Sequence, residues 1–137
     1  MENWLIRKIE KKDNPAVAQL IRDVFDELNI PKVGTAYADP YLDLMFEEYS
    51  KPKSVYFVVE CNGKIIGSAG VAPLENEAEN ICELQKMYFL QEARGKGIGF
   101  QMIQKCLQEA TELGYEKCYL ETLPEMLTAQ HLYKKAG

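Results

Sequence analysis

The sequence contains little of what metal sites and nucleophilic triads are built from. Its 137 residues include a single histidine, His131, and four cysteines, which do not have the spacing of a metal-ligand motif. A covalent acyl-cysteine would need a base beside its thiol, and nothing in the sequence pairs His131 with a cysteine. We therefore expect no bound metal and no cysteine nucleophile, and we expect His131 to lie on the surface.

Long apolar runs are also missing. No segment approaches the length of a transmembrane helix, and the N-terminus lacks the basic and apolar regions of a signal peptide. Three cysteines fall in predicted strands and one on a predicted helix face, which suggests reduced thiols that pack as small apolar side chains: Cys61, Cys82, Cys106 and Cys118. Reduced thiols without a signal peptide predict a cytoplasmic protein with no membrane partner.

Positive charge is in the minority. Sixteen Lys and Arg stand against 21 Asp and Glu, and the formal net charge is -5. Binding to nucleic acid needs a basic face, and none is visible, so nucleic acid is not expected as a partner. With 47% apolar and 27% charged residues, the composition is that of an ordinary globular protein. The length predicts one domain over residues 1–137.

Periodicity and turn signals predict the order β-α-α-β-β-β-α-β-α. Strands are expected at 4–9, 54–61, 64–71, 81–90 and 117–121. Helices are expected from Asp13-Asn14-Pro15, from Asp39-Pro40, over 98–113, and after Thr122. Asn62-Gly63 predicts a tight hairpin between the second and third strands. Three antiparallel strands followed by a βαβ unit predict an α+β fold with a mixed, mostly antiparallel central sheet flanked by helices.

A glycine-rich turn, residues 94–99, joins the strand at 81–90 to the helix at 98–113. Such a turn aims backbone N–H groups and the positive end of the helix dipole at one point, which makes an anion site. A P-loop would need Ser or Thr after Gly95-Lys96, but Gly97 stands there. A dinucleotide-binding fingerprint would need a glycine where the sequence has Phe100.

The pattern that fits is Arg/Gln-x-x-Gly-x-Gly/Ala, with Arg94, Gly97 and Gly99 at its fixed positions. This turn resembles the acyl-CoA pyrophosphate loop of the GCN5-related N-acetyltransferase (GNAT) superfamily. The element order and the closing Leu-Tyr-x-x-x-Gly over 132–137 are similar to that family too. Family members continue into a sixth and usually a seventh strand, which this sequence does not include.

The resemblance implies that acetyl-CoA is the cosubstrate. Its pyrophosphate would lie on the backbone of the glycine turn, and its pantetheine amides would pair with the strand before it. At least one of the cations Arg94 and Lys96 would contact or attract the phosphates. The cofactor-binding positions implied in this way are Met87, Tyr88, Phe89, Arg94, Gly95, Lys96, Gly97, Ile98, Gly99 and Phe100.

Three residues are catalytic candidates by the same resemblance. Tyr133 matches the general acid that protonates the leaving thiolate, and its alternative role is packing against the sheet. Glu83 matches the base that deprotonates the amine, usually through water; strict alternation would place it on the same strand face as Phe89. A solvent-facing role for Glu83 is nearly as well supported. Glu121, at the end of the fifth strand, is the rival base.

We therefore expect an N-acetyltransferase that moves the acetyl group of acetyl-CoA to a primary amine, by direct attack in a ternary complex. The acceptor would be a small molecule or a peptide N-terminus, and a homodimer is left open. A non-catalytic acyl-CoA-binding module is the alternative. Substrate choice would depend on the loop at 29–39. Acidic residues near it would suit a cationic amine or simply face solvent: Asp39, Asp43, Glu47 and Glu48.

Overall fold

The computed structural model describes residues 4–28, 42–74, 80–93 and 97–120, and these form one five-stranded sheet in the order β1-β2-β3-β4-β5. The strands are β1 (Trp4–Lys8), β2 (Val55–Cys61), β3 (Lys64–Pro73), β4 (Ile81–Phe89) and β5 (Lys117–Leu120). Neighbours from β1 to β4 are antiparallel, while β4 and β5 are parallel. The predicted mixed, mostly antiparallel sheet is confirmed, although β3 extends past residue 71 to Pro73.

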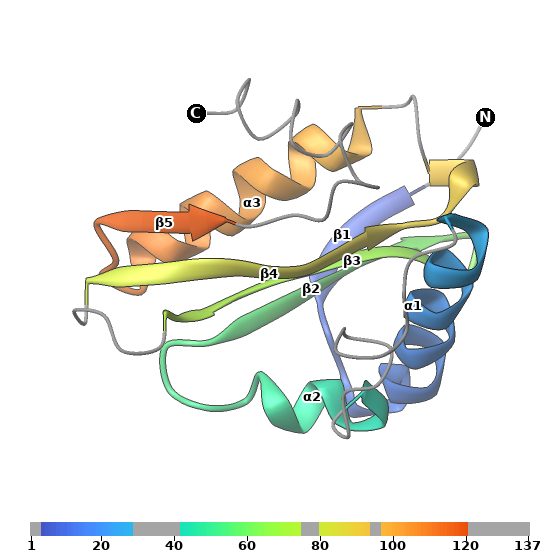
Figure 1. Cartoon of the computed structure of the whole chain (residues 1–137), viewed down its shortest axis with the longest axis horizontal. Helices are drawn as coiled ribbons and strands as arrows, with labels where there is room; N and C mark the ends of the chain where they lie inside the picture. The colour runs from blue at the N-terminus through green and yellow to red at the C-terminus, as the bar shows by residue number, and fades with distance from the viewer. Residues whose placement is uncertain (1–3, 29–41, 75–79, 94–96, 121–137) are drawn as a thin grey trace.

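Helices cover both faces of this sheet (Figure 1). Helices α1 (Asn14–Leu28) and α2 (Met45–Glu48) lie on one side, and α3 (Ile98–Glu112) lies on the other. On the first side the ring of Phe25 packs 5.4 Å from the ring of Tyr88. On the second, Lys105 Nζ lies 5.8 Å from the centre of the Phe57 ring. None of the helices in the described ranges is long and apolar enough to cross a membrane. The helix predicted after Thr122 lies outside these ranges.

A buried carboxylate at the start of α1 ties this helix to the sheet. Asp13, in the short 3₁₀ helix η1 (Lys11–Asp13), accepts hydrogen bonds from Arg7 Nη1 at 2.8 Å and Nη2 at 3.0 Å. It also accepts one from the backbone N–H of Glu10 at 2.7 Å, so it closes the turn before α1. Arg7 donates in addition to Glu60 of β2 at 2.8 Å. Asp13 thus caps the turn that precedes α1.

The hairpin predicted at Asn62-Gly63 is present. Asn62 has φ 53° and Gly63 has φ 82°, and they connect β2 directly to β3. Two left-handed residues in succession are what a type I′ turn requires, and their twist matches that of the flanking strands. This local signal therefore specifies the pairing of two long buried strands.

β4 carries a bulge that the sequence pattern does not show. Between Ser68 and Gly70, β3 advances two residues, whereas β4 advances three between the paired positions Tyr88 and Gln85. Lys86, inside this segment, has φ 48°, a left-handed conformation that is uncommon for a lysine. The extra residue reverses the alternation of side chains along β4.

The predicted shared face of Glu83 and Phe89 is therefore wrong. In the register with β3, Glu83 and Gln85 share a face with Tyr88, which packs on α1. Phe89 points to the opposite face, where its ring lies against Gly67. Strict alternation fails because one extra residue shifts every later side chain to the other face.

Candidate functional site

The first part of the site is the N-terminus of α3. Gly97 is its N-cap residue, with φ 76°, and glycine has no side chain with which to cap the helix. Among the described residues, a Cβ added at Gly97 would meet no atom within 4 Å, so there is room beside this first position of the helix. Ile98 is buried and fixes the first turn in the core. Backbone N–H groups at such a helix N-terminus are suited to an anion such as a pyrophosphate.

The segment that leads to α3 has the predicted strand-turn-helix context. β4 ends at Phe89, and the short 3₁₀ helix η4 (Gln91–Ala93) follows it. The side chains of Met87 and Tyr88 are buried and that of Phe89 is half-buried, so any contact of these three with a cofactor falls to their backbone groups. Arg94, Gly95 and Lys96 lie outside the described residues, and their roles stay predictions.

The pairing of β4 with β5 is short. In the described ranges it runs from Ile81↔Lys117 to Leu84↔Leu120, before the bulge of β4. Pairing of the backbone of residues 87–89 with the pantetheine, which the family resemblance implies, therefore stays a prediction. β5 places Tyr119 beside Glu83 at this edge of the sheet, so the candidate base lies where the described pairing ends.

Glu83 is half-buried and engaged by a neighbour on its own strand. Its Oε1 accepts a hydrogen bond of 2.7 Å from Gln85 Nε2. Gln85 Oε1 in turn accepts one of 2.6 Å from the hydroxyl of Tyr49, which stands just after α2. The sequence contained a weak signal for Gln85, two residues after Glu83 on the same face. It contained none for Tyr49, which only the folded chain brings to β4.

A second pair of hydroxyls holds the bulge itself. The hydroxyl of Tyr56 lies 2.8 Å from Lys86 O and 2.8 Å from Ser68 Oγ. A carbonyl can only accept, so the single phenol proton goes to Lys86 and the Ser68 hydroxyl donates to Tyr56. Burial raises the pKa of Tyr56 well above its ordinary value, which keeps this proton in place at neutral pH.

The acidic residues near the start of α2 have partners of their own. Arg22 reaches the Asp43 carboxylate at 3.1 Å, and Lys51 reaches the Glu48 carboxylate at 3.4 Å. Glu47 accepts a hydrogen bond of 2.7 Å from Asn14 Nδ2, which holds the pKa of this carboxyl below its usual value. These contacts favour the interpretation of a solvated helix surface over that of an acidic substrate rim.

The remaining catalytic candidates, Glu121 and Tyr133, lie outside the described residues, as does His131. The structure therefore does not test whether they approach Glu83. The described cysteines are all free thiols; Cys82 and Cys106 are buried as predicted, whereas Cys61 and Cys118 are only partly buried.

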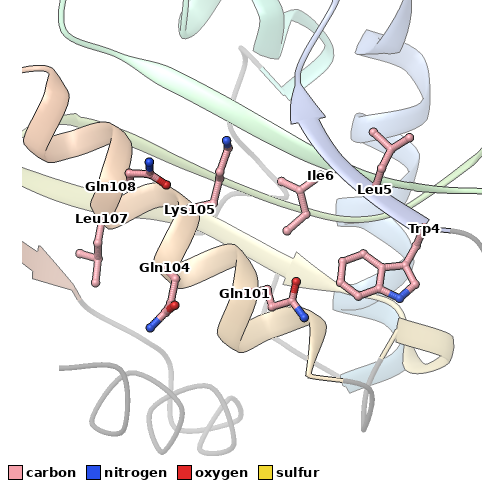
Figure 2. A pocket seen from close by; sticks show the side chains of 8 residues that line it. All are labelled: Trp4, Leu5, Ile6, Gln101, Gln104, Lys105, Leu107 and Gln108. Carbon is pink, nitrogen blue, oxygen red and sulfur yellow. The ribbon is translucent and has the colours of Figure 1, made fainter.

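A groove of about 690 Å³ runs between β1 and α3 (Figure 2). Its lining combines apolar side chains with three amides and one cation: Trp4, Leu5, Ile6, Gln101, Gln104, Lys105, Leu107 and Gln108. None of the predicted site residues belongs to this lining. Trp4 and Ile6 face α3, on the opposite side of the sheet from Glu83, so the groove is separate from the candidate base.

Comparison with known proteins decides the family. The model of the Acetyltransferase (GNAT) family matches residues 17–137. The chain belongs to this family. The predicted enzyme class, an acetyl-CoA-dependent N-acetyltransferase, is thereby confirmed. A GNAT relative, the uncharacterized N-acetyltransferase YjgM of Escherichia coli K12, is 41% identical over 134 residues, which is 97% of this chain and 80% of that protein.

Solved GNAT structures share the fold. An acetyltransferase of the GNAT family from Staphylococcus aureus Mu50 superposes with a TM-score of 0.86 at 23% identity, over 98% of this chain and 84% of that one. A predicted acetyltransferase from Clostridium acetobutylicum, solved with acetyl-CoA, has a TM-score of 0.76 at 25% identity, over 100% and 89% of the two chains. These likenesses show that the chain has the GNAT fold.

Proposed function

We propose that this GNAT acetyltransferase transfers the acetyl group of acetyl-CoA to a primary amine of a small molecule or a peptide N-terminus, by direct attack in a ternary complex. The observation that carries the proposal is the N-terminus of α3 at Gly97, a glycine N-cap that follows β4 and η4 and has room beside it among the described residues. The Clostridium acetobutylicum relative with acetyl-CoA supports this assignment of the cosubstrate.

The residues around this point would divide the work of acyl transfer. Backbone N–H groups of 97–100 would hold the pyrophosphate, and backbone groups of 87–89 would align the pantetheine and the thioester. The amine nitrogen attacks the carbonyl carbon, and the C–S bond breaks. Glu83 takes the proton from the amine, directly or through a water, and Tyr133 gives a proton to the leaving sulfur. Glu121 is the alternative base.

Direct attack is supported by the state of the two buried cysteines, Cys82 and Cys106, which are not activated as nucleophiles. Burial raises the pKa of the Cys106 thiol. The pKa of the Cys82 thiol is raised by the neighbouring Cys118 thiol and by burial. Both remain protonated at neutral pH, and a thiol is a poor nucleophile compared with a thiolate. An acyl-cysteine on either residue is therefore disfavoured, and positioning of the two substrates becomes the main source of rate.

The test is a screen of primary amines with acetyl-CoA, in which a thiol reagent detects released CoA and mass spectrometry detects the acetylated amine. Polyamines, amino sugars, amino acids and short peptides would cover the acceptor classes. Gly97→Asp is the matched control, because it should lose turnover with every amine. Binding of acetyl-CoA without transfer to any amine would support the alternative, a non-catalytic acyl-CoA-binding module.

A further inference from the structure

We propose that Gln85 and Tyr49 are positioning residues for Glu83, acting through the hydrogen-bonded chain Tyr49–Gln85–Glu83. The inference rests on the proposed function, in which Glu83 accepts the proton of the amine. This hydrogen-bonded chain begins at Tyr49, just after α2, and ends at Glu83 in β4. The donor–acceptor distance is 2.6 Å from Tyr49 to Gln85 and 2.7 Å from Gln85 to Glu83. Both distances are short for their type, and the two bonds share one amide group.

The direction of the chain is set by the charge of Glu83. An ionised carboxylate can only accept, so the amide nitrogen of Gln85 must face it. The amide oxygen then faces Tyr49, whose hydroxyl has to donate. Reversing the amide would place its oxygen against the carboxylate oxygen. The observed bond from Gln85 Nε2 is therefore one that a carboxylate oxygen of Glu83 can accept.

The bond leaves part of the carboxylate available. Gln85 engages Oε1 of Glu83, and no residue in the described ranges donates a hydrogen bond to Oε2. With one oxygen held, the plane of the carboxylate is fixed and the second oxygen keeps a defined direction. Catalytic groups gain most from such restraint, because a displacement of about 1 Å costs on the order of 10²-fold in rate.

The far end of the chain is rigid. Tyr49 is 5% exposed, and its ring centre lies 4.7 Å from that of Tyr56. Gly70 lies close beneath this ring, and a Cβ added there would come within 3.1 Å of Tyr49 Cε1. The backbone N–H of Tyr49 also donates to Met45 O at 3.1 Å. Tyr49 can therefore hold a flexible glutamine side chain that would otherwise sample several rotamers.

Packing alone would not require the hydroxyl. A phenylalanine at position 49 would keep the ring contact with Tyr56 and the cover over Gly70, and would lose the hydrogen bond to Gln85. Tyr49→Phe thus removes the hydrogen bond from Tyr49 to Gln85. Gln85→Ala removes that bond and the one from Gln85 to Glu83. Tyr115→Phe is the matched control, because its buried hydroxyl donates to a backbone carbonyl, Lys53 O, at 2.8 Å and does not bond to Gln85 or Glu83.

The experiment is a double-mutant cycle with an amine found in the screen. Tyr49→Phe and Gln85→Ala should each lower kcat about tenfold or more while the KM for acetyl-CoA stays within about twofold. In a Glu83→Gln background, either change should have little further effect, because there is no base left to position. Tyr115→Phe should keep wild-type kcat, and melting temperatures would identify any variant that fails to fold.

Several results would overturn the inference. Equal losses from Tyr49→Phe in the wild-type and Glu83→Gln backgrounds would mean that the hydroxyl acts independently of Glu83. Full activity of Glu83→Gln, in an enzyme that does acetylate amines, would show that Glu83 is not the base. Gln85 and Tyr49 could then not act as its positioning residues, although the proposed function would stand. If Tyr49→Phe does not fold, Gln85→Ala decides by the same cycle. An absence of transfer to every amine would overturn the proposed function together with the inference.

Discussion

The hydroxyl of Tyr56 donates a hydrogen bond of 2.8 Å to the carbonyl oxygen of Lys86, the left-handed residue at the bulge of β4. The two residues are 30 positions apart, on strands separated by β3. The bond satisfies a carbonyl in the sheet interior near the point where the register shifts. It links the core to the bulge that directs Glu83 and Phe89 to opposite faces.

Tyr56→Phe should destabilise the protein by about 1–3 kcal/mol, because the buried carbonyl of Lys86 and the hydroxyl of Ser68 both lose a partner. Urea unfolding at neutral pH would measure the loss. Adding Ser68→Ala to Tyr56→Phe should restore part of the stability, since it removes the buried hydroxyl that has lost its Tyr56 partner. An unchanged unfolding midpoint for Tyr56→Phe would show that the bulge does not depend on this bond.

Gly70→Ala should be poorly tolerated. The new Cβ would enter the ring of Tyr56 and come within 2.9 Å of Val55 O, and overpacking of this kind costs about 1–3 kcal/mol or more. We expect a lower melting temperature and, through the displaced Tyr49, a lower kcat. Gly63→Ala is the control, because a Cβ there meets nothing within 4 Å and only its positive φ opposes the change.

Gly97→Asp should abolish binding of acetyl-CoA, because a carboxylate in front of α3 would occupy and repel the phosphate position. Gly97→Ala adds a Cβ into open space and carries the same backbone strain at φ 76° without a charge, so it should retain measurable binding. Isothermal calorimetry on the two folded variants separates charge from strain. Wild-type affinity in Gly97→Asp would place the pyrophosphate elsewhere.

The Arg7–Asp13 ion pair should make stability depend on pH in acid. The hydrogen bond from Arg7 holds the pKa of Asp13 below its usual value, so the carboxylate contributes its stability above the unfolded-state pKa of about 3.9. That contribution is lost as the pH falls from about 4 through the lower folded-state pKa. Urea unfolding should show a steeper loss below pH 4 for the wild type than for Asp13→Asn. Asp43→Asn, at an exposed pair with Arg22, should keep the wild-type slope.

The cysteines should react with iodoacetamide in a definite order. The interaction with the Cys82 thiol lowers the pKa of Cys118, which is also partly exposed. The pKa values of Cys82 and Cys106 are raised, and both thiols are buried. Peptide mapping after limited alkylation should find Cys118 modified before these two. Cys82→Ala should slow the reaction of Cys118; a rate that is unchanged or faster would contradict the thiol contact.

The order of the described elements and the position of the glycine-rich turn follow from local signals. Asn62-Gly63 specifies a hairpin because only a few residue types adopt two left-handed conformations in succession. The glycines before α3 mark a strand-turn-helix junction for the same kind of reason, and Gly97 does adopt a positive φ. Such signals need only two to four neighbouring residues, so they can be read without knowing the fold.

The geometry around Glu83 was decided by tertiary structure alone. Lysine has no local preference for a positive φ, so nothing near Lys86 in the sequence predicts the bulge. Its carbonyl partner, Tyr56, comes from another strand, and Tyr49 reaches Gln85 across 36 residues. Contacts of this range form only when the sheet and α2 have packed together. Residue types therefore identify the candidate base, but the packed core determines which face it occupies and what holds it there.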